Sequence, residues 1–388
     1  MNLKDRWSSL DKNKKIMTYV GLAVLVILII AIVVVVVMPV KNKEDNNKPT
    51  PTQTPTQTKE PVAKSTKAAT KEPKQTIPAG KAVSRLTGKY IDKKVAKKRP
   101  IAVMFNNISV ASPQSGISQA DILYECVTEG GITRLMGIFQ NTDSDRIGSL
   151  RSARHYFVSF AKEWDAIYIH VGGSDAAYDK IKALEIDDLN GIYGIGNTLV
   201  YRDKSIKAPH NAFTSTDKIA KSVEQMGFRT KYKGKDGNHF NFNEKNTTAK
   251  KGKAAVSVSI KYSSYTSPYF NYDKKKGVYV RYQFGEKHTD YNTGKQLKFK
   301  NIILMNVNEW TMDSSGRQDM DITDNTGDGW YITNGKAVKI KWKKKESDNS
   351  MKFLDESGKL LSINKGKTYI GVVPDSLAAD TVFSSKAK

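Results

Sequence analysis

An uninterrupted apolar run near the N-terminus constrains this chain more than any other feature. From Ile16 to Met38 the sequence reads IMTYVGLAVLVILIIAIVVVVVM and contains no charged residue. This length suffices to cross the roughly 30 Å hydrocarbon core of a bilayer, and a helix that is apolar on every side is not the pattern of a protein surface. The sequence therefore predicts one transmembrane helix over residues 16–38.

Charged residues on either side of this run predict its orientation. Lys4, Arg6, Lys12, Lys14 and Lys15 precede it, whereas Lys41, Lys43 and Lys48 follow it together with Glu44 and Asp45. Because cytoplasmic flanks carry the excess of Lys and Arg, residues 1–15 are predicted to be a cytoplasmic tail. Neither the small residues of a cleavage site nor a Cys for lipidation follows the run. We therefore expect the run to be an uncleaved signal anchor that crosses the cell membrane once. The C-terminal domains are then expected to be extracytoplasmic.

A polar tract separates the apolar run from the rest of the chain. Residues 39–80 are rich in Pro, Thr, Gln and Lys, as in the segment NNKPTPTQTPTQTKEP. Such a composition cannot bury enough apolar surface to fold, and its prolines favour an extended backbone. This tract is predicted to be a disordered linker that holds the folded part away from the bilayer.

The remaining residues change their pattern near residue 250, which predicts two domains and an α+β fold. Residues 81–249 alternate short apolar strands with helical patterns and are predicted to form an α/β domain. Its strands are expected at 101–105, 122–127, 132–139 and 166–171, and its helices at 152–164 with Ser152 as N-cap, at 174–184, and at 215–226 before Gly227. Residues 250–388 contain short alternating strands between turns such as KKKG, TNGK and ESGK, which predict a mostly β domain.

The net charge of the chain indicates which classes of molecule it can bind. Its 63 Lys and Arg against 39 Asp and Glu give a formal net charge of +24, which attracts polyanions. Nucleic acid is scarce outside the cytoplasm, so it is not an expected partner. The expected partner is an anionic envelope polymer or peptidoglycan. The single cysteine, Cys126, excludes an internal disulfide and a thiolate-built zinc site. The sequence assigns no cofactor.

Six ordered blocks of the first folded part resemble a known family. RPIAVMFNN (99–107), SPQSGISQADILYE (112–125), EGGITRLM (129–136), RIGSLRSAR (146–154), DAIYIHVGGS (165–174) and APHNAF (208–213) look like signatures of the YerB-like family. The second part is similar to its C-terminal part through TGKQLKFKNIILM (293–305), NGKAVKIKW (334–342) and GKTYIGVVP (366–374). The resemblance implies a two-part extracytoplasmic bacterial protein, usually a lipoprotein, without established activity. This chain departs from the family in carrying an apolar run where a lipidated Cys is usual.

An arginine cluster is the first candidate site. Arg146, Arg151 and Arg154 lie at or just before the start of the predicted 152–164 helix, and Arg134 can join them from the EGGITR turn. Cations are disfavoured there, because a helix N-terminus already presents partial positive charge, so an anion is expected to compensate. A bound phosphate or carboxylate would be held by guanidinium forks and backbone N–H groups. Internal pairing with Glu125, Glu129 or Asp145 is the alternative.

A second candidate site follows the predicted strand 166–171. There His170, Gly172, Gly173 and Ser174 lead into a helix, a geometry that allows an anion to approach the backbone. The alternative is an ordinary helix cap formed by Ser174 or Asp175.

Two histidines and two asparagines complete the candidate residues. His170 and His210 can converge with Asp175 at one rim of the sheet and bind a metal or transfer protons, although no HExxH-type spacing is present and no metal is predicted. Structural hydrogen bonding of each histidine is the alternative. Asn106 follows the 101–105 strand together with Asn107, and residues at such strand ends deliver functional side chains or shape turns. Asn211 follows His210 and is also a candidate ligand-binding residue.

Two classes of function fit these observations. The first is a binding or scaffolding protein of the bacterial envelope, whose basic surface holds an anionic or phosphate-bearing ligand such as a wall polymer. The second is an envelope hydrolase or transferase, in which arginines clamp a phosphorylated or glycan substrate and His170 or His210 moves protons. The enzyme requires these polar groups to converge in one open cavity.

Overall fold

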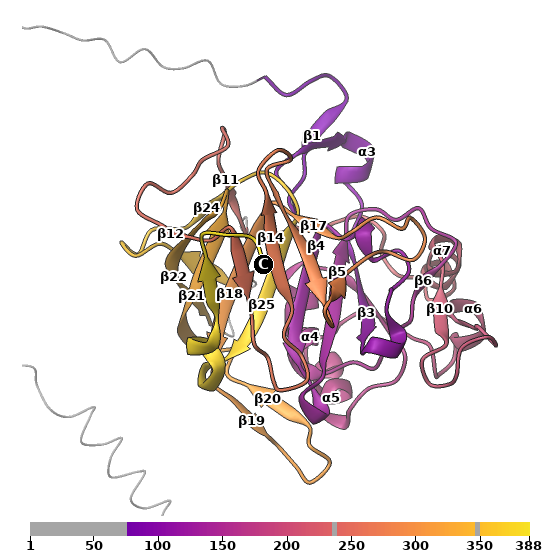
Figure 1. The fold of residues 1–388 in the computed structure, drawn as a ribbon. Helices are drawn as coiled ribbons and strands as arrows, with labels where there is room; N and C mark the ends of the chain where they lie inside the picture. The colour runs from indigo at the N-terminus through magenta and orange to yellow at the C-terminus, as the bar shows by residue number, and fades with distance from the viewer. Residues whose placement is uncertain (1–75, 235–238, 346–349) are drawn as a thin grey trace, which may run out of the picture. The chain divides into compact units, whose positions relative to one another are not determined.

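The computed structural model describes residues 76–234, 239–345 and 350–388 (Figure 1). The predicted cytoplasmic tail, the predicted transmembrane helix over 16–38 and the predicted linker up to residue 75 lie outside these residues. Within the described ranges, no helix combines the length and the apolar character needed to cross a bilayer.

One large mixed sheet runs through most of the described chain. Its eleven strands lie in the order β12-β22-β21-β18-β25-β4-β5-β3-β7-β8, with β23 paired to β22. The strands before residue 250 are β3 (Ile101–Asn107), β4 (Ile122–Val127), β5 (Thr133–Phe139), β7 (Ile167–His170) and β8 (Asp188–Asn190). Those after it are β12 (Lys253–Ala254), β18 (Asn301–Val307), β21 (Asn325–Thr333), β22 (Lys336–Lys344), β23 (Lys352–Leu354) and β25 (Thr368–Pro374).

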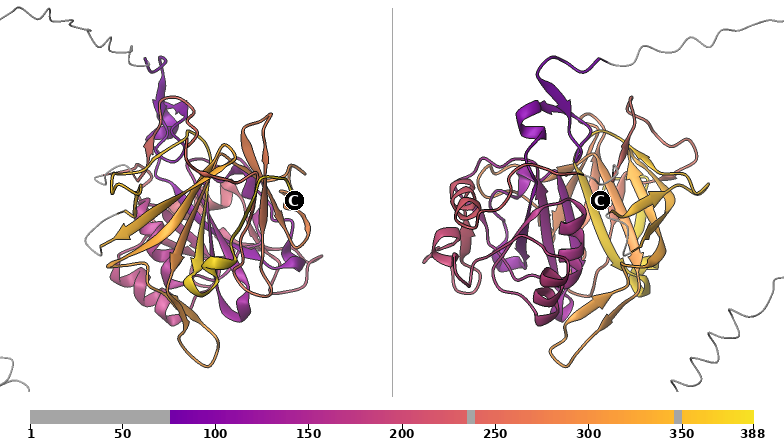
Figure 2. Two further views of the ribbon diagram at one scale, coloured as in Figure 1. Left: turned by 60° about the vertical axis from the view of Figure 1, so that its left-hand side comes forward. Right: turned by 180° about the vertical axis from the view of Figure 1, so that it is seen from behind.

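The two parts of the sheet join through a pair of parallel strands. β25 pairs with β4 over five residues, from Thr368 opposite Ile122 to Val372 opposite Cys126. In Figures 1 and 2 the indigo strands and the yellow and orange strands accordingly form one continuous surface. The hydrogen-bond ladder therefore crosses between the segment before residue 250 and the segment after it.

A second sheet covers one face of the large one. Its strands are β13 (Ser257–Ser259), β14 (Tyr269–Asp273), β15 (Val278–Gln283), β16 (Glu286–Lys287), β17 (Lys298–Phe299) and β26 (Val382–Ser384). Buried apolar side chains of both sheets, among them Phe270, Tyr279 and Leu304, form one core cluster. The chain thus has an α+β fold with a mostly β C-terminal part, which confirms the fold class expected for the folded residues.

Two of the helices cover the opposite face of the large sheet. α4 (His155–Glu163) and α5 (Asp175–Ala183) contribute Tyr156, Phe157, Phe160 and Ala177 to a second core cluster, which also contains Met104 and Met305 of the sheet. α7 (Thr216–Gln225) lies on the same face as the second sheet, because its Ile219 and Val223 belong to the core cluster between the two sheets. Its N-cap is Ser215, and it ends before Gly227, which has φ +65°. The helices α3 (Lys93–Ala96) and α6 (Gly196–Leu199) are single turns.

One predicted helix boundary is wrong. The helix expected from Ser152 begins at His155, with Arg154 as its N-cap residue. Residues 151–153 are instead extended, because Val171 donates its backbone N–H to the carbonyl of Arg151 at 3.1 Å and Ala153 donates to Gly172 at 2.9 Å. Non-local backbone pairing therefore overrides the helical pattern at Ser152.

Short sheets and a tight hairpin complete the fold. The small sheets pair β1 (Lys81–Val83) with β2 (Tyr90–Asp92), β10 (Ala212–Thr214) with β6 (Ile147–Gly148) and β9 (Tyr201–Arg202), β11 (Asn241–Phe242) with β24 (Ser362–Ile363), and β19 (Glu309–Thr311) with β20 (Gln318–Met320). The hairpin β21–β22 turns at Asn334 and Gly335, which have φ +50° and +75°. The Asn-Gly pair of the predicted TNGK turn supplies these two conformations.

A buried polar network joins the two facing sheets. The carboxylate of Glu125 on β4 forms a 2.6 Å ion pair with Arg281 on β15, and both side chains are fully buried. Tyr369 and Thr133 donate hydroxyl hydrogen bonds to the same carboxylate at 2.7 and 2.6 Å, and Asn107 donates its amide at 3.1 Å. Every donor that reaches Glu125 thus comes from a different strand.

A buried histidine makes the fold sensitive to acid. His239 lies with its ring centroid 3.8 Å from that of Trp164, and its Nε2 donates to the backbone carbonyl of Glu163. Burial lowers the pKa of His239 to about 3. A histidine in the unfolded chain has a pKa of about 6.5, so between these two values the unfolded state binds more protons than the folded state. The contribution of neutral His239 to the free energy of unfolding is therefore fully present above pH 6.5 and is lost as the pH falls toward 3.

We predict that His239→Phe flattens the acid side of the stability profile. Phenylalanine keeps an aromatic ring beside Trp164 but removes the proton linkage. In urea titrations between pH 6 and 4, the free energy of unfolding should fall less steeply with pH for the variant than for the parent. The two slopes should differ by about 1.4 kcal/mol per pH unit. Equal slopes for the two proteins would show that His239 does not titrate in this way.

Candidate anion-binding site

The arginine cluster is built around one carboxylate in the turn between β4 and β5. Glu129 accepts hydrogen bonds from Arg134, at 3.2 Å, and from Arg154. Arg134 also donates to the carbonyl of Ser152 at 2.8 Å, and Arg154 donates to that of Ala153 at 2.6 Å. The extended segment 151–153 therefore supplies the carbonyl groups that orient both guanidinium groups.

Burial and charge act together in this cluster. Arg134 and Arg154 are 7% and 9% exposed, and burial, together with the charge of Arg154, lowers the pKa of Arg134 to about 10. Burial alone would raise the pKa of Glu129, but the hydrogen bond from Arg154 and the charges of both arginines hold it below its usual value. Of the three internal partners suggested by the sequence, Glu129 is the one that pairs. Glu125 binds Arg281 instead, and Arg146 pairs with Asp203 at 2.7 Å.

Arg151 extends this cluster toward solvent. It is partly exposed, and its Nη1 lies 3.4 Å from the carbonyl of Pro209. Burial lowers the pKa of Arg151, and the neighbouring charge of Arg154 lowers it further. Burial and Arg151 likewise lower the pKa of His210, whose Nδ1 lies 2.9 Å from the amide nitrogen of Asn106. The structure thus brings together six predicted residues: Asn106, Glu129, Arg134, Arg151, Arg154 and His210.

His170, Gly172 and Gly173 have structural roles in the turn that follows β7. His170 is fully buried, with Nδ1 2.8 Å from the carbonyl of Gly172 and Nε2 3.0 Å from Asp188. Gly172 has φ +73°, and a Cβ there would lie 2.9 Å from Ile192. Gly173 pairs with Ala153 in an isolated parallel bridge. Both ring nitrogens of His170 are therefore occupied by internal partners.

The remaining predicted residues have separate partners. Ser174 is the N-cap of α5, and its hydroxyl accepts from the backbone N–H of Ala177 at 3.3 Å. Asn211 is 8% exposed and accepts from Arg202 at 3.0 Å. Asp175 is exposed, and its carboxylate lies 3.9 Å from Arg317, whereas the hydrogen-bond partners described for His170 and His210 are other residues. In the described part of the chain, no three His, Cys, Asp or Glu side chains are grouped so that they could hold a metal ion.

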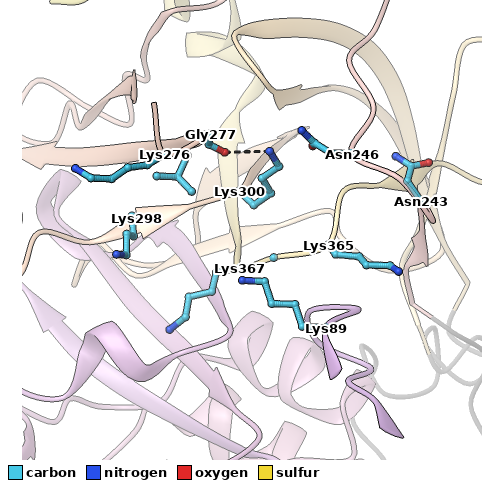
Figure 3. A pocket seen from close by; sticks show the side chains of 11 residues that line it. Lys89, Asn243, Asn246, Lys276, Gly277, Lys298, Lys300, Lys365 and Lys367 are labelled. Carbon is cyan, nitrogen blue, oxygen red and sulfur yellow. Dashed lines mark hydrogen bonds between the residues drawn. The ribbon is translucent and has the colours of Figure 1, made fainter. Parts of the chain in front are cut away.

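A lysine pocket, which the sequence analysis did not assign, lies on the C-terminal half. This pocket has a volume of about 370 Å³ (Figure 3). Its lining contains six lysines, Lys89, Lys276, Lys298, Lys300, Lys365 and Lys367, together with Asn243, Asn246, Gly277, Val278 and Gly366. Figure 3 shows the lysine side chains coming from several directions around the pocket. The described lining residues include no carboxylate, and Lys276 pairs at 2.9 Å with Asp273, which lies outside the lining.

Backbone and amide oxygens hold two of these amines in place. Lys300 donates to the carbonyl of Gly277 at 3.0 Å and to the side chain of Asn334 at 2.6 Å. Lys367 donates to the carbonyl of Ser118 at 2.5 Å. Such partners orient an ammonium group without neutralising it.

Burial and neighbouring positive charges lower the pKa of the same two amines. Burial lowers the pKa of Lys300, and the charge of Lys89 lowers it further. Burial also lowers the pKa of Lys367, where Lys89 and Lys298 act in the same direction, against Asp121 and Asp290. A bound anion would relieve this repulsion, so the lysine pocket is suited to hold one.

A partial signal for this pocket exists in the sequence. Lys298 and Lys300 in QLKFK, and Lys365 and Lys367 in NKGK, are spaced two residues apart, which places each pair on one side of an extended segment. Lys89 and Lys276 join them only through tertiary structure. The sequence analysis recognised the basic character of the whole chain but not these six residues.

We predict that removing the charge of Glu129 destabilises the arginine cluster. In Glu129→Gln, two buried guanidinium groups lose their carboxylate, which should lower the free energy of unfolding by about 2 to 4 kcal/mol. Asp328→Asn is the control, because it breaks the exposed pair with Lys341 and should cost less than about 1 kcal/mol. Urea denaturation with and without inorganic phosphate measures both effects. Phosphate should stabilise Glu129→Gln more than the parent, and equal stability of the two variants would contradict the prediction.

Comparison with known proteins places this architecture in a family. Residues 86–229 match the model described as the N-terminal domain of a protein of unknown function (DUF3048), and residues 258–370 match its C-terminal domain. A Bacillus subtilis (strain 168) protein named "Putative lipoprotein YerB" is 35% identical over 311 residues, which cover 79% of this chain and 91% of that protein.

A solved structure agrees with this assignment. The crystal structure of the YerB protein from Bacillus subtilis matches with a TM-score of 0.69 and 32% identity, over 78% of this chain and 99% of the other. The similarity thus extends through both matched segments and the sheet that they share. This chain belongs to the YerB-like family, which the sequence blocks indicated.

Proposed function

We propose that this chain is a membrane-anchored extracytoplasmic binding protein whose lysine pocket holds an anionic, phosphate-bearing ligand such as an envelope polymer. The observation that carries this proposal is the gathering of six lysines around one opening, with no carboxylate among the lining residues that the structure describes. Clustered like charges cost free energy in the free protein, and a protein retains them where an anion offsets that cost.

The proposed location rests on two supports. The apolar run from Ile16 to Met38 is long enough for a single-pass anchor. The Bacillus relative carries a name that describes it as a lipoprotein, and lipoproteins are membrane-associated. A lipid and a transmembrane helix are alternative anchors for the same extracytoplasmic domains, so both observations favour one location.

The lysine side chain indicates the manner of binding. An ammonium group on a flexible stem acts as a point charge, whereas a guanidinium group imposes a planar fork. Six lysines therefore suit a ligand that carries several phosphates along a flexible chain. The enzyme alternative receives no support from His170, because internal hydrogen bonds occupy both of its ring nitrogens.

We predict that removing two pocket lysines weakens binding of a phosphate polymer. The double variant Lys298→Ala/Lys365→Ala should bind synthetic poly(glycerol phosphate) at least about ten-fold more weakly than the parent, because two favourable charge contacts are lost. The full-length chain in phosphatidylcholine nanodiscs is titrated, and binding is followed by isothermal calorimetry. Lys339→Ala/Lys343→Ala, which removes two exposed lysines of β22 outside the pocket, is the matched control.

Salt separates pocket binding from diffuse attraction. Polymer affinity of the parent should fall as sodium chloride is raised, since screening weakens charge contacts. Equal affinities of the two double variants at every salt concentration would mean that the pocket is not the site. Polyglutamate of similar length tests the phosphate requirement, and it should bind more weakly than the phosphate polymer.

We also expect a pH dependence of polymer binding. The pKa values of Lys300 and Lys367 lie below that of an ordinary lysine, so these two amines lose their protons at a lower pH than a free lysine side chain does. The affinity should therefore be complete near neutral pH and should fall as the pH rises through these lowered values. Calorimetry in buffers of different ionisation enthalpy should show proton uptake on binding at alkaline pH, and binding without proton uptake would contradict this assignment.

A further inference from the structure

A groove on the other half of the molecule combines an apolar floor with a cationic end. It has a volume of about 780 Å³ and lies between α7 and the ends of the sheet strands β3, β5 and β7. Ile101, Phe139 and Ile167 line it from the sheet side, and Ile219, Val223 and Phe228 line it from α7 and the turn that follows. These side chains belong to, or pack against, the core cluster between the two sheets. The groove therefore opens directly onto the apolar interior.

Positive charge gathers on one pair of segments beside this floor. Lys94, Lys97, Lys98 and Lys231 line the groove and are exposed. Lys98 and Lys231 are partners in an antiparallel bridge, and the N–H of Tyr232 donates to the carbonyl of Lys97 at 3.0 Å, so the lysines are neighbours in space. No ion pair of Lys94, Lys97 or Lys231 is found within the described ranges. Among the lining residues that the structure describes, Glu224 is the one carboxylate.

We infer that this groove binds the alkyl chain of a long-chain fatty acid, with the carboxylate held by the lysines at its cationic end. An apolar helix or strand of a protein partner would fill the floor but would leave the lysines without a counter-charge. A free polyanion would satisfy the lysines but would place charge against isoleucine and phenylalanine side chains. An amphiphile with one anionic group matches both ends, because its apolar and charged parts are separated as they are in the groove.

This inference is independent of the lysine pocket proposed above. The two sites share no lining residue, since the pocket is lined mainly by residues beyond position 240 and the groove by residues 94–231. Failure of one proposal therefore leaves the other untouched. The double variant Lys298→Ala/Lys365→Ala should retain fatty-acid binding, which keeps the two tests distinguishable.

Photolabelling tests the inference on the full-length chain. A diazirine derivative of palmitate is irradiated with the protein in phosphatidylcholine nanodiscs, and labelled peptides are identified by mass spectrometry. We expect labels within residues 94–101 and 216–231, and competition by unlabelled palmitate. Labels spread over the surface, or equal labelling by the corresponding uncharged alcohol, would overturn the inference.

Two variants separate the floor from the cationic end. Ala220 is exposed on α7 and lines the groove, so Ala220→Trp should fill it and reduce labelling at least about ten-fold. Its matched control is Lys221→Trp, an exposed position of the same helix outside the lining. Lys97→Glu/Lys231→Glu should reduce labelling to a similar degree, whereas Lys204→Glu/Lys207→Glu on an exposed loop should not. Circular dichroism verifies folding, and unchanged labelling in either groove variant would refute the assignment.

Discussion

An ion pair between two fully buried side chains, Glu125 and Arg281, is the constraint on which the rest of this structure depends. Removing two charged groups from water costs several kcal/mol of folding free energy unless hydrogen bonds satisfy them. Here Tyr369, Thr133 and Asn107 reach the carboxylate, and they come from β25, β5 and β3. The pair therefore ties four neighbouring strands of the large sheet to β15 of the other sheet. Because the donors lie in both family-matched segments, neither segment can satisfy this carboxylate alone.

The shared sheet also explains why the pocket lysines meet. β18 and β25 are parallel neighbours, with Asn301 opposite Thr368. The residues that precede two parallel strands arrive at the same edge of the sheet, so Lys298 and Lys300 meet Lys365 and Lys367 there. Gly366 permits the close approach, since a Cβ at this position would lie 2.4 Å from the Cβ of Lys300. The lysine pocket is thus a consequence of strand order.

Local patterns predicted local structure well, and they failed where partners are distant. Ser174 and Ser215 cap helices as hydroxyl groups do before an apolar helical repeat, and the Asn-Gly pair makes the β21–β22 turn. Ser152 has the same local appearance, yet its segment pairs with residues 171–173, which no spacing in the sequence reveals. The same limit applies to the sites. The arginine cluster was predictable because its members lie within 26 residues, from Glu129 to Arg154, whereas the pocket spans residues 89 to 367.

The arginine cluster and the lysine pocket differ in how far internal partners already occupy their charged groups. In the arginine cluster, Glu129 and the carbonyls of Ser152 and Ala153 already occupy Arg134 and Arg154, so its charge serves mainly to fix the start of α4. In the lysine pocket the partners of Lys300 and Lys367 are neutral oxygens, which orient the amines but do not cancel their charge. Arginine forks favour such fixed internal geometry, and lysines favour exchangeable contacts with solvent or ligand. The distribution of the two residue types therefore separates a structural role from a binding role within one basic protein.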